Sequence, residues 1–250
     1  MNTLSRHQAG FSLIEFMIAG TLGLILTAGA MQLFLATRQT QSLQAQSQLL
    51  RENGMNALSF IRREIQRSGW SETGLSARDN PINFSLANYA TGNGVSGPGN
   101  LSDRLALTFD LAADEVDCAG NTPANPVTEV FYVDANGSLK CRSGNQEVEL
   151  VNGVESLQFQ FGVDTRPNAT PAFRTPLLYR NAGTVTAAER NNLISVRMAL
   201  LLRSPDKPSG GGTVTTNYSL LDAAALNKAS DGYLRREFQL TAQLPNTRRD

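Results

Sequence analysis

The sequence predicts an α+β fold in which one long N-terminal α-helix packs on an antiparallel β-sheet domain. An apolar run from Phe11 to Leu35 is followed by a proline-free, glutamine-rich stretch, so a single helix is expected to continue to about Ser68. Beyond residue 100, apolar and polar residues alternate over several segments, as they do in strands with one buried face. At the standard rise, the expected helix would be about 90 Å long.

The first part of this helix is expected to cross a membrane. As a helix, the run from Phe11 to Leu35 would be about 37 Å long, compared with a hydrocarbon core of about 30 Å. Arg6 and the N-terminal amine precede the run, and such positive charges keep the preceding segment on the cytoplasmic side. The only charged residue inside the run is Glu15, and a lone carboxylate in a spanning helix is by default functional.

A short motif stands at the start of the apolar run. Residues 10–15, GFSLIE, resemble the type III signal of type IV prepilins and type II secretion pseudopilins. The resemblance implies that a prepilin peptidase cleaves between Gly10 and Phe11 on the cytoplasmic side and methylates the new amine of Phe11. The alternative is a signal anchor that happens to share these residues. A cleavable secretory signal would instead place its cleavage site after the apolar run.

Glu15 is expected to act in subunit assembly. Cleavage would leave a cationic amine at a helix N-terminus, where the helix dipole already disfavours a cation. Glu15 lies one helical turn further along, so its carboxylate can meet the amine of its own chain or of a neighbouring subunit. In a single subunit the carboxylate would lie near the lipid headgroups, whereas inside a filament it would need a partner.

Four segments are expected along the chain. They are a leader over residues 1–10, a membrane-spanning or filament-core helix over 11–37, its periplasmic continuation over 38–68, and a soluble β-rich domain over 69–250. The continuation carries an apolar face at helical spacing, formed by Leu50, Ala57, Leu58, Ile61 and Ile65. This face is expected to pack on the domain, and Gly69 is the candidate C-cap.

Alternation predicts the strands, and turn-forming residues predict the loops between them. The predicted strands cover Leu105–Leu111, Val127–Val133, Leu157–Val163, Leu193–Arg203 and Phe238–Leu244. The pair Asn136-Gly137 predicts a hairpin turn, whereas residues 70–100, 167–192 and 204–217 are expected to be loops.

Three longer sequence segments narrow the resemblance to one family. The segments LVNGVESLQFQFGVDT, LISVRMALLLRS and YLRREFQL resemble the PilW family of type IV pilus minor pilins, which are related to the J-type minor pseudopilins of type II secretion. This resemblance implies a pilin-like fold, with the long helix packed on the sheet domain.

Composition argues against several other classes of function. The chain has 22 basic and 22 acidic residues, and this balance argues against nucleic acid as the main partner. Its single histidine lies in the leader, so the mature chain cannot build a Ser-His-Asp or Cys-His centre, and no Walker loop is present. We therefore expect no enzyme activity and no cofactor. The acids Asp110, Asp114, Glu115 and Asp117 miss the EF-hand spacing, so we expect a solvated acidic turn and no metal site.

The only two cysteines are Cys118 and Cys141, in the part expected to be exported. In an oxidising compartment such a pair is expected to form a disulfide. Zinc would need four ligands, and the mature chain has no histidine to contribute. The alternative is two free structural thiols.

These expectations are compatible with three functions. The preferred one is a minor pilin that assembles with other minor pilins and the major pilin to initiate or cap a type IV pilus, in twitching motility and adhesion. Its further partners would be prepilin peptidase and the pilus assembly platform. It would be a single-pass protein of the bacterial inner membrane with its soluble domain in the periplasm, or at the pilus tip. The second function is a minor pseudopilin of type II secretion. The third is a membrane-anchored periplasmic enzyme or binding protein.

Overall fold

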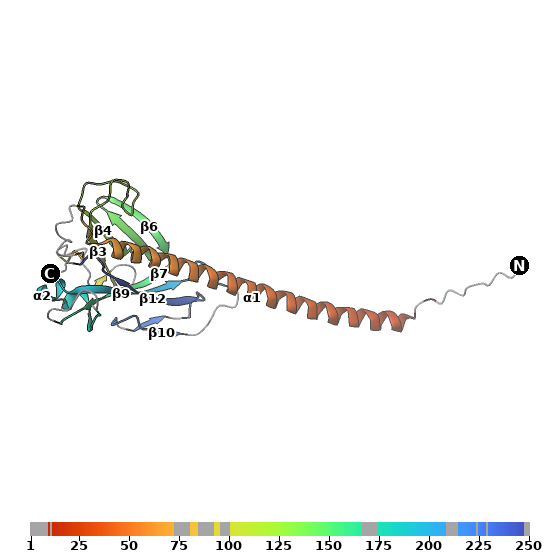
Figure 1. The fold of residues 1–250 in the computed structure, drawn as a ribbon. Helices are drawn as coiled ribbons and strands as arrows, with labels where there is room; N and C mark the ends of the chain where they lie inside the picture. The colour runs from red at the N-terminus through yellow and green to blue at the C-terminus, as the bar shows by residue number, and fades with distance from the viewer. Residues whose placement is uncertain are drawn as a thin grey trace.

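The computed structural model shows one long helix that projects from a β-rich domain (Figure 1). It describes residues 10, 12–72, 81–84, 93–95, 101–166, 175–208, 215–223, 225–228 and 230–247. The helix, α1, runs from Leu13 to Arg67 over 55 residues, which corresponds to about 83 Å. The single long helix expected from the sequence is therefore confirmed.

The C-terminal end of α1 depends on a glycine. Ser68 is the C-cap, and Gly69 follows with a φ of +78°, a left-handed conformation that favours glycine. The amide of Gly69 donates to the carbonyl of Thr108 at 2.9 Å. A side chain at Gly69 would also lie 2.8 Å from the carbonyl oxygen of Asn246. Gly69 thus lets the chain turn sharply from α1 onto the first sheet.

Two four-stranded antiparallel sheets form most of the domain. The first sheet has the order β3-β4-β5-β6, with β3 at Leu105–Phe109, β4 at Val127–Val133, β5 at Ser138–Ser143 and β6 at Gln146–Asn152. The second has the order β12-β9-β7-β8, with β12 at Arg235–Gln243, β9 at Leu193–Arg203, β7 at Val154–Val163 and β8 at Leu178–Arg180. The five predicted strands correspond to β3, β4, β7, β9 and β12, and Gly137 occupies the turn of the predicted hairpin between β4 and β5.

Several short elements lie in stretches that were expected to be loops. They are β1 at Asn93–Val95, β8, η2 at Ala182–Thr184, α2 at Ala187–Arg190 and β10 at Thr216–Tyr218, while β2 at Leu101–Asp103 and β11 at Leu226–Lys228 lie in stretches for which no element was predicted. The loop predictions for residues 70–100, 167–192 and 204–217 are wrong at β1, β8, η2, α2 and β10. Three or four residues are too few to display a strand or helix period, so alternation could not reveal these elements.

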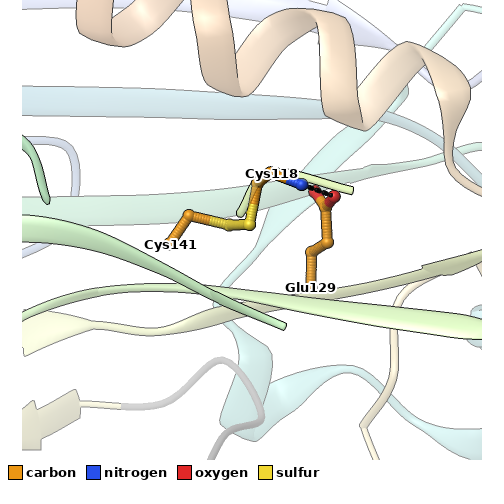
Figure 2. Close-up of side chains that lie close together, drawn as sticks. All are labelled: Cys118, Glu129 and Cys141. Atoms are coloured by element: carbon orange, nitrogen blue, oxygen red, sulfur yellow. Dashed lines mark hydrogen bonds between the residues drawn. A yellow bond between two sulfur atoms is a disulfide. The ribbon is translucent and has the colours of Figure 1, made fainter. Parts of the chain in front are cut away.

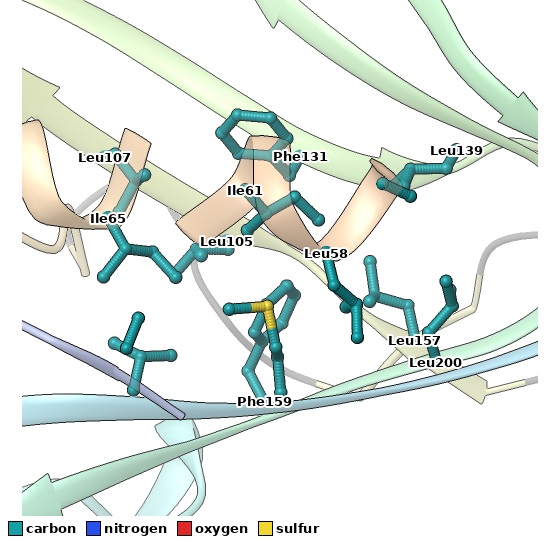
Figure 3. Packing of buried hydrophobic residues seen from close by; sticks show 14 of the residues in the cluster. Leu58, Ile61, Ile65, Leu105, Leu107, Phe131, Leu139, Leu157, Phe159 and Leu200 are labelled. Atoms are coloured by element: carbon teal, nitrogen blue, oxygen red, sulfur yellow. The ribbon is translucent and has the colours of Figure 1, made fainter. Parts of the chain in front are cut away.

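The hydrophobic core lies between α1 and the two sheets (Figure 3). Its fully buried members include Leu58, Ile61 and Ile65 from α1, Leu105 and Leu107 from β3, Phe131 from β4, Leu139 from β5, Leu157 and Phe159 from β7, and Leu200 from β9. The apolar helix face expected from residues 50 to 65 is therefore confirmed as a packing face. Because α1 contacts both sheets, the helix and the domain form a single packed unit.

Candidate functional site

The predicted cleavage position lies just ahead of the helix. Gly10 is exposed and outside α1, and Ser12 is the N-cap, whose carbonyl accepts the amide of Phe16 at 3.1 Å. Phe11, the predicted cleavage and methylation residue, lies outside the described residues. A side chain at Gly10 would meet no atom within 4 Å among the residues described. Any requirement for glycine there would therefore come from the peptidase and not from the fold.

Glu15 lies in the first turn of α1 and is exposed. It is the only acidic residue in that turn, where the helix dipole favours a negative charge. The residues from Ser12 to Gln41 are all exposed, so this half of the helix is not buried against the described part of the domain. The carboxylate of Glu15 is thus open to a partner group.

The free half of α1 is covered with large apolar side chains. Leu13 is 78% exposed, Phe16 76% and Leu26 74%, and others continue to Leu35. By length and composition, α1 is apolar enough to cross a membrane, and none of its most apolar window is buried inside the domain. An apolar surface of this size is what a membrane anchor presents, so these features agree with the expected membrane anchoring.

Polar side chains within this half satisfy themselves on the helix. The hydroxyl of Thr21 donates to the carbonyl of Ile18 at 2.9 Å, and that of Thr37 donates to Leu33 at 2.8 Å. Thr27 bonds in the same way to Gly23. Hydroxyls bonded to the preceding turn do not need water, so they are tolerated in lipid or in a bundle of helices.

At its other end, α1 is held to the domain by a buried group of charges. The guanidinium of Arg67 lies 2.8 Å from Glu64 and 3.3 Å from Glu129 of β4, and it stacks over the ring of Phe109 at 4.2 Å. Glu129 is fully buried, and one of its carboxylate oxygens has no hydrogen-bond partner. Burial, followed by the nearby charge of Glu64, raises the pKa of Glu129 to about 8.

A disulfide adjoins this charged group. Cys118 and Cys141 are bonded to each other, with Cα atoms 6.3 Å apart, and Glu129 lies beside them (Figure 2). The other carboxylate oxygen of Glu129 accepts the amide of Cys118 at 2.7 Å. The bridge links the loop between β3 and β4 to β5, so the loop, the sheet and the end of α1 meet at one point. The sulfur atoms and Glu129 are close enough to hold a metal ion, but bonded sulfurs offer no thiolate as a ligand.

The acidic stretch after β3 is more buried than the solvated turn that was expected. Asp110 and Asp117 are buried, so the prediction of a solvated turn is wrong at these two positions, whereas Asp114 is exposed. Asp110 accepts the hydroxyl of Ser71 at 2.9 Å and the amide of Glu72 at 3.2 Å. Asp117 accepts two amides of its own turn, from residues 119 and 121. Both carboxylates replace missing backbone partners in the loop, which residue spacing alone cannot reveal.

Two further residues that fix α1 were not found by sequence reasoning. The side-chain amide of Asn246 donates to the carbonyls of Gln66 and Arg67, at 3.1 and 3.3 Å, and so caps the end of the helix from the far end of the chain. A side chain at Gly54 would collide with the ring of Phe238 on β12. Neither residue carries a local signal, because each role depends on a neighbour distant in sequence.

Comparison with known proteins agrees with this arrangement. Residues 130–246 match the family described as type IV pilus-assembly protein W (PilW), and residues 5–31 match the prokaryotic N-terminal methylation motif. No curated protein matches the chain. A type IV-like pilin from Thermus thermophilus, TTHA1219, matches with a TM-score of 0.49 and 16% identity over 79% of this chain and 98% of that one. The resemblance to PilW-family minor pilins is confirmed over these two regions: the chain has a PilW region and an N-terminal methylation motif.

Proposed function

We propose that this chain is a non-catalytic minor pilin that assembles with other minor pilins to initiate or cap a type IV pilus. The observation that carries the proposal is the free half of α1, which is exposed, apolar and marked by the methylation motif in a chain that also has a PilW region. Within the described residues this half of the helix has no packing partner, so its function would lie in lipid and between subunits.

In this proposal each part of the chain has its own task. Prepilin peptidase removes residues 1–10 by cutting after Gly10 and methylates Phe11. Residues 11–37 hold the subunit in the bacterial inner membrane and later enter the filament core. Residues 38–68 carry the soluble domain, residues 69–250, in the periplasm, and the assembly platform with the major pilin extends the fibre from the initiating complex.

Glu15 would drive the transfer from membrane to filament. Its exposed carboxylate can pair with the methylated amine of a neighbouring subunit once the helices bundle away from water. An amine left unpaired in that bundle would cost about 3 kcal/mol or more, which is the usual consequence of breaking a buried ion pair. Pairing between subunits would therefore favour assembly over storage in the bilayer.

The proposal is tested with Glu15→Val in the full-length chain, expressed in cells that lack the native copy. The variant should be inserted and cleaved after Gly10, as judged by intact mass, but should recover at least about tenfold less of the partner pilins on affinity purification. Glu52→Val is the matched control, because Glu52 is an exposed acid on the part of the helix outside the membrane run. Normal recovery with Glu15→Val and normal pili would contradict the role of Glu15.

The phenotype of cells that lack the chain distinguishes a role in a type IV pilus from a role in type II secretion. Loss of the chain should abolish surface pili and twitching while secretion of exported enzymes continues. The reverse result, with secretion lost and pili retained, would instead assign the chain to a type II secretion pseudopilus. The matched family, described as a pilus-assembly protein, favours the first outcome. An unprocessed chain that purifies without any pilin would favour a membrane-anchored periplasmic enzyme or binding protein.

A further inference from the structure

A groove of about 510 Å³ is lined by residues of α1 and by Leu150 of β6. Figure 1 shows β6 beside this part of the helix. Apolar atoms of Ala57 and Phe60 on α1 and of Leu150 on β6 contribute to its lining. Leu150 is the extra residue at a bulge in β6, between the pairs that Leu139 and Lys140 make with that strand. Bulges at sheet edges re-aim side chains, and here the bulge supplies the sheet's contribution to the groove.

Two exposed arginines line the same groove, and one of them, Arg63, also interacts electrostatically with Glu64. Arg62 and Arg63 are both exposed, and neither has a carboxylate within 4 Å among the residues that the structure describes. The guanidinium of Arg63 instead lies over the Phe60 ring, 5.4 Å from its centroid. Arg67, one turn further along, has its charge met by Glu64 and Glu129. The groove therefore combines apolar lining with two positive charges that can accept carboxylates from outside.

The strand beside the groove is also open on one side. β6 is the last strand in the order β3-β4-β5-β6, and within the described part of the chain no strand pairs with its outer edge. An edge strand can accept an extended segment of another chain through backbone hydrogen bonds. An occupant of the groove would thus meet apolar lining, two cations and a row of backbone donors and acceptors.

The distance of the groove from the membrane indicates whether lipid or protein would occupy it. Arg38 is the first charged residue after the apolar run, and Arg62 lies 24 positions later on the same helix, which corresponds to about 36 Å. Lipid headgroups lie well below that level when the helix is anchored. The surfaces that surround the groove at this height are the soluble domains of other subunits that are anchored in the same way.

We propose that the groove between α1 and β6 binds an extended, acidic segment of a neighbouring pilin-like subunit, whose carboxylates pair with Arg62 and Arg63. This inference rests on the proposed function, because it takes the neighbours to be membrane-anchored pilins. It adds a second contact, made by the soluble domain, to the one at Glu15. The contact at Glu15 would hold any subunit with a prepilin helix, whereas the groove would select among partners by the charge of their domains.

The test is charge reversal in the full-length chain. Arg62→Glu combined with Arg63→Glu should leave insertion and cleavage unchanged and lower the recovery of partner pilins about tenfold, because the reversed charges repel an acidic segment. Arg51→Glu is the matched control: Arg51 is an exposed arginine of α1 about 16 Å before Arg62 and outside the groove. It should purify with its partners as the wild type does.

Photo-crosslinking locates the contact. A benzophenone amino acid in place of Ser59, inside the groove, should form an adduct that mass spectrometry maps to an acidic segment of a pilin subunit. An adduct with lipid alone, or no loss of partners on charge reversal, would overturn the inference and leave the proposed function standing. If the wild-type chain itself recovers no pilin subunit, the proposed function fails, and the inference fails with it.

Discussion

The two halves of α1 are continuous in backbone but differ in their surroundings. From Ser12 to Gln41 every residue is exposed, whereas the half from Leu50 to Arg67 buries one face between two sheets. The first half is apolar nearly all round, and the second is apolar on one side only. A helix that is apolar all round needs lipid or other helices, and an amphipathic one needs a single apolar surface. One helix can therefore belong to two assemblies, a domain and a membrane or fibre.

The strongest test of this contrast removes the same side chain from each half. Ile61 is fully buried, so Ile61→Ala should lower the free energy of unfolding by about 4 kcal/mol through lost burial and the cavity left behind. Ile25 is 65% exposed, and Ile25→Ala should leave domain stability within about 0.5 kcal/mol. Denaturant unfolding of the full-length chain in detergent, followed by near-ultraviolet circular dichroism, measures both. Equal losses would mean that the free half also packs on the domain.

The disulfide gives the next largest expected effect. Cys118 and Cys141 lie 23 residues apart, and closing a loop of that size stabilises a domain by about 3.5 kcal/mol on the chain-entropy model. The double variant Cys118→Ser with Cys141→Ser should lose about that much while leaving cleavage after Gly10 unaffected. Peptide mapping of the wild type without reductant should show no free thiol. Complete alkylation under those conditions would contradict the bridge.

Substituting one glycine in each half of α1 tests the same difference in packing between the two halves. Gly54→Ala should cost about 2 kcal/mol, because the new methyl group would overlap the ring of Phe238 and force β12 away from α1. Gly23→Ala meets no atom within 4 Å in the described part of the chain, so domain stability should not fall. Thermal unfolding of the two variants side by side checks this. A stable Gly54→Ala would show that the helix and β12 separate freely.

The last expected effect is a dependence of stability on pH. Because burial raises the pKa of Glu129 to about 8 from an ordinary 4.5, the folded state binds a proton that the unfolded state has lost. The contribution of this group to stability should therefore be complete below about pH 4.5 and decline as the pH rises toward 8. Glu129→Gln should flatten this decline, whereas Glu149→Gln, an exposed acid on β6, should not. A flat wild-type profile across this range would contradict the raised pKa.

Sequence reasoning succeeded where a signal is local and repeats. The bounds of β9 at Leu193 and Arg203 matched the prediction, and the apolar face of α1 did so at each predicted residue. It did not reveal that the strands divide into two sheets, because alternation shows that one face of a strand is buried but not which element covers that face. The charge group at Arg67 was missed for the same reason: Glu64 lies close in sequence, but Glu129 is 62 residues away. Of the candidate site, the roles of Gly10 and Glu15 stay predictions that rest on one short, contiguous motif.

The cap at Asn246 has a consequence for the order in which the fold is completed. Its hydrogen bond to the carbonyl of Gln66 joins residues 180 positions apart, and β12, which lies against α1, is made long after the helix. The packing face of α1 therefore waits for β12 while the strands between them in sequence are made. Contacts between such distant parts form slowly, since a long loop must close before they are made. A chain synthesised only as far as β9 would thus present the helix face without the strand and the cap that complete its packing.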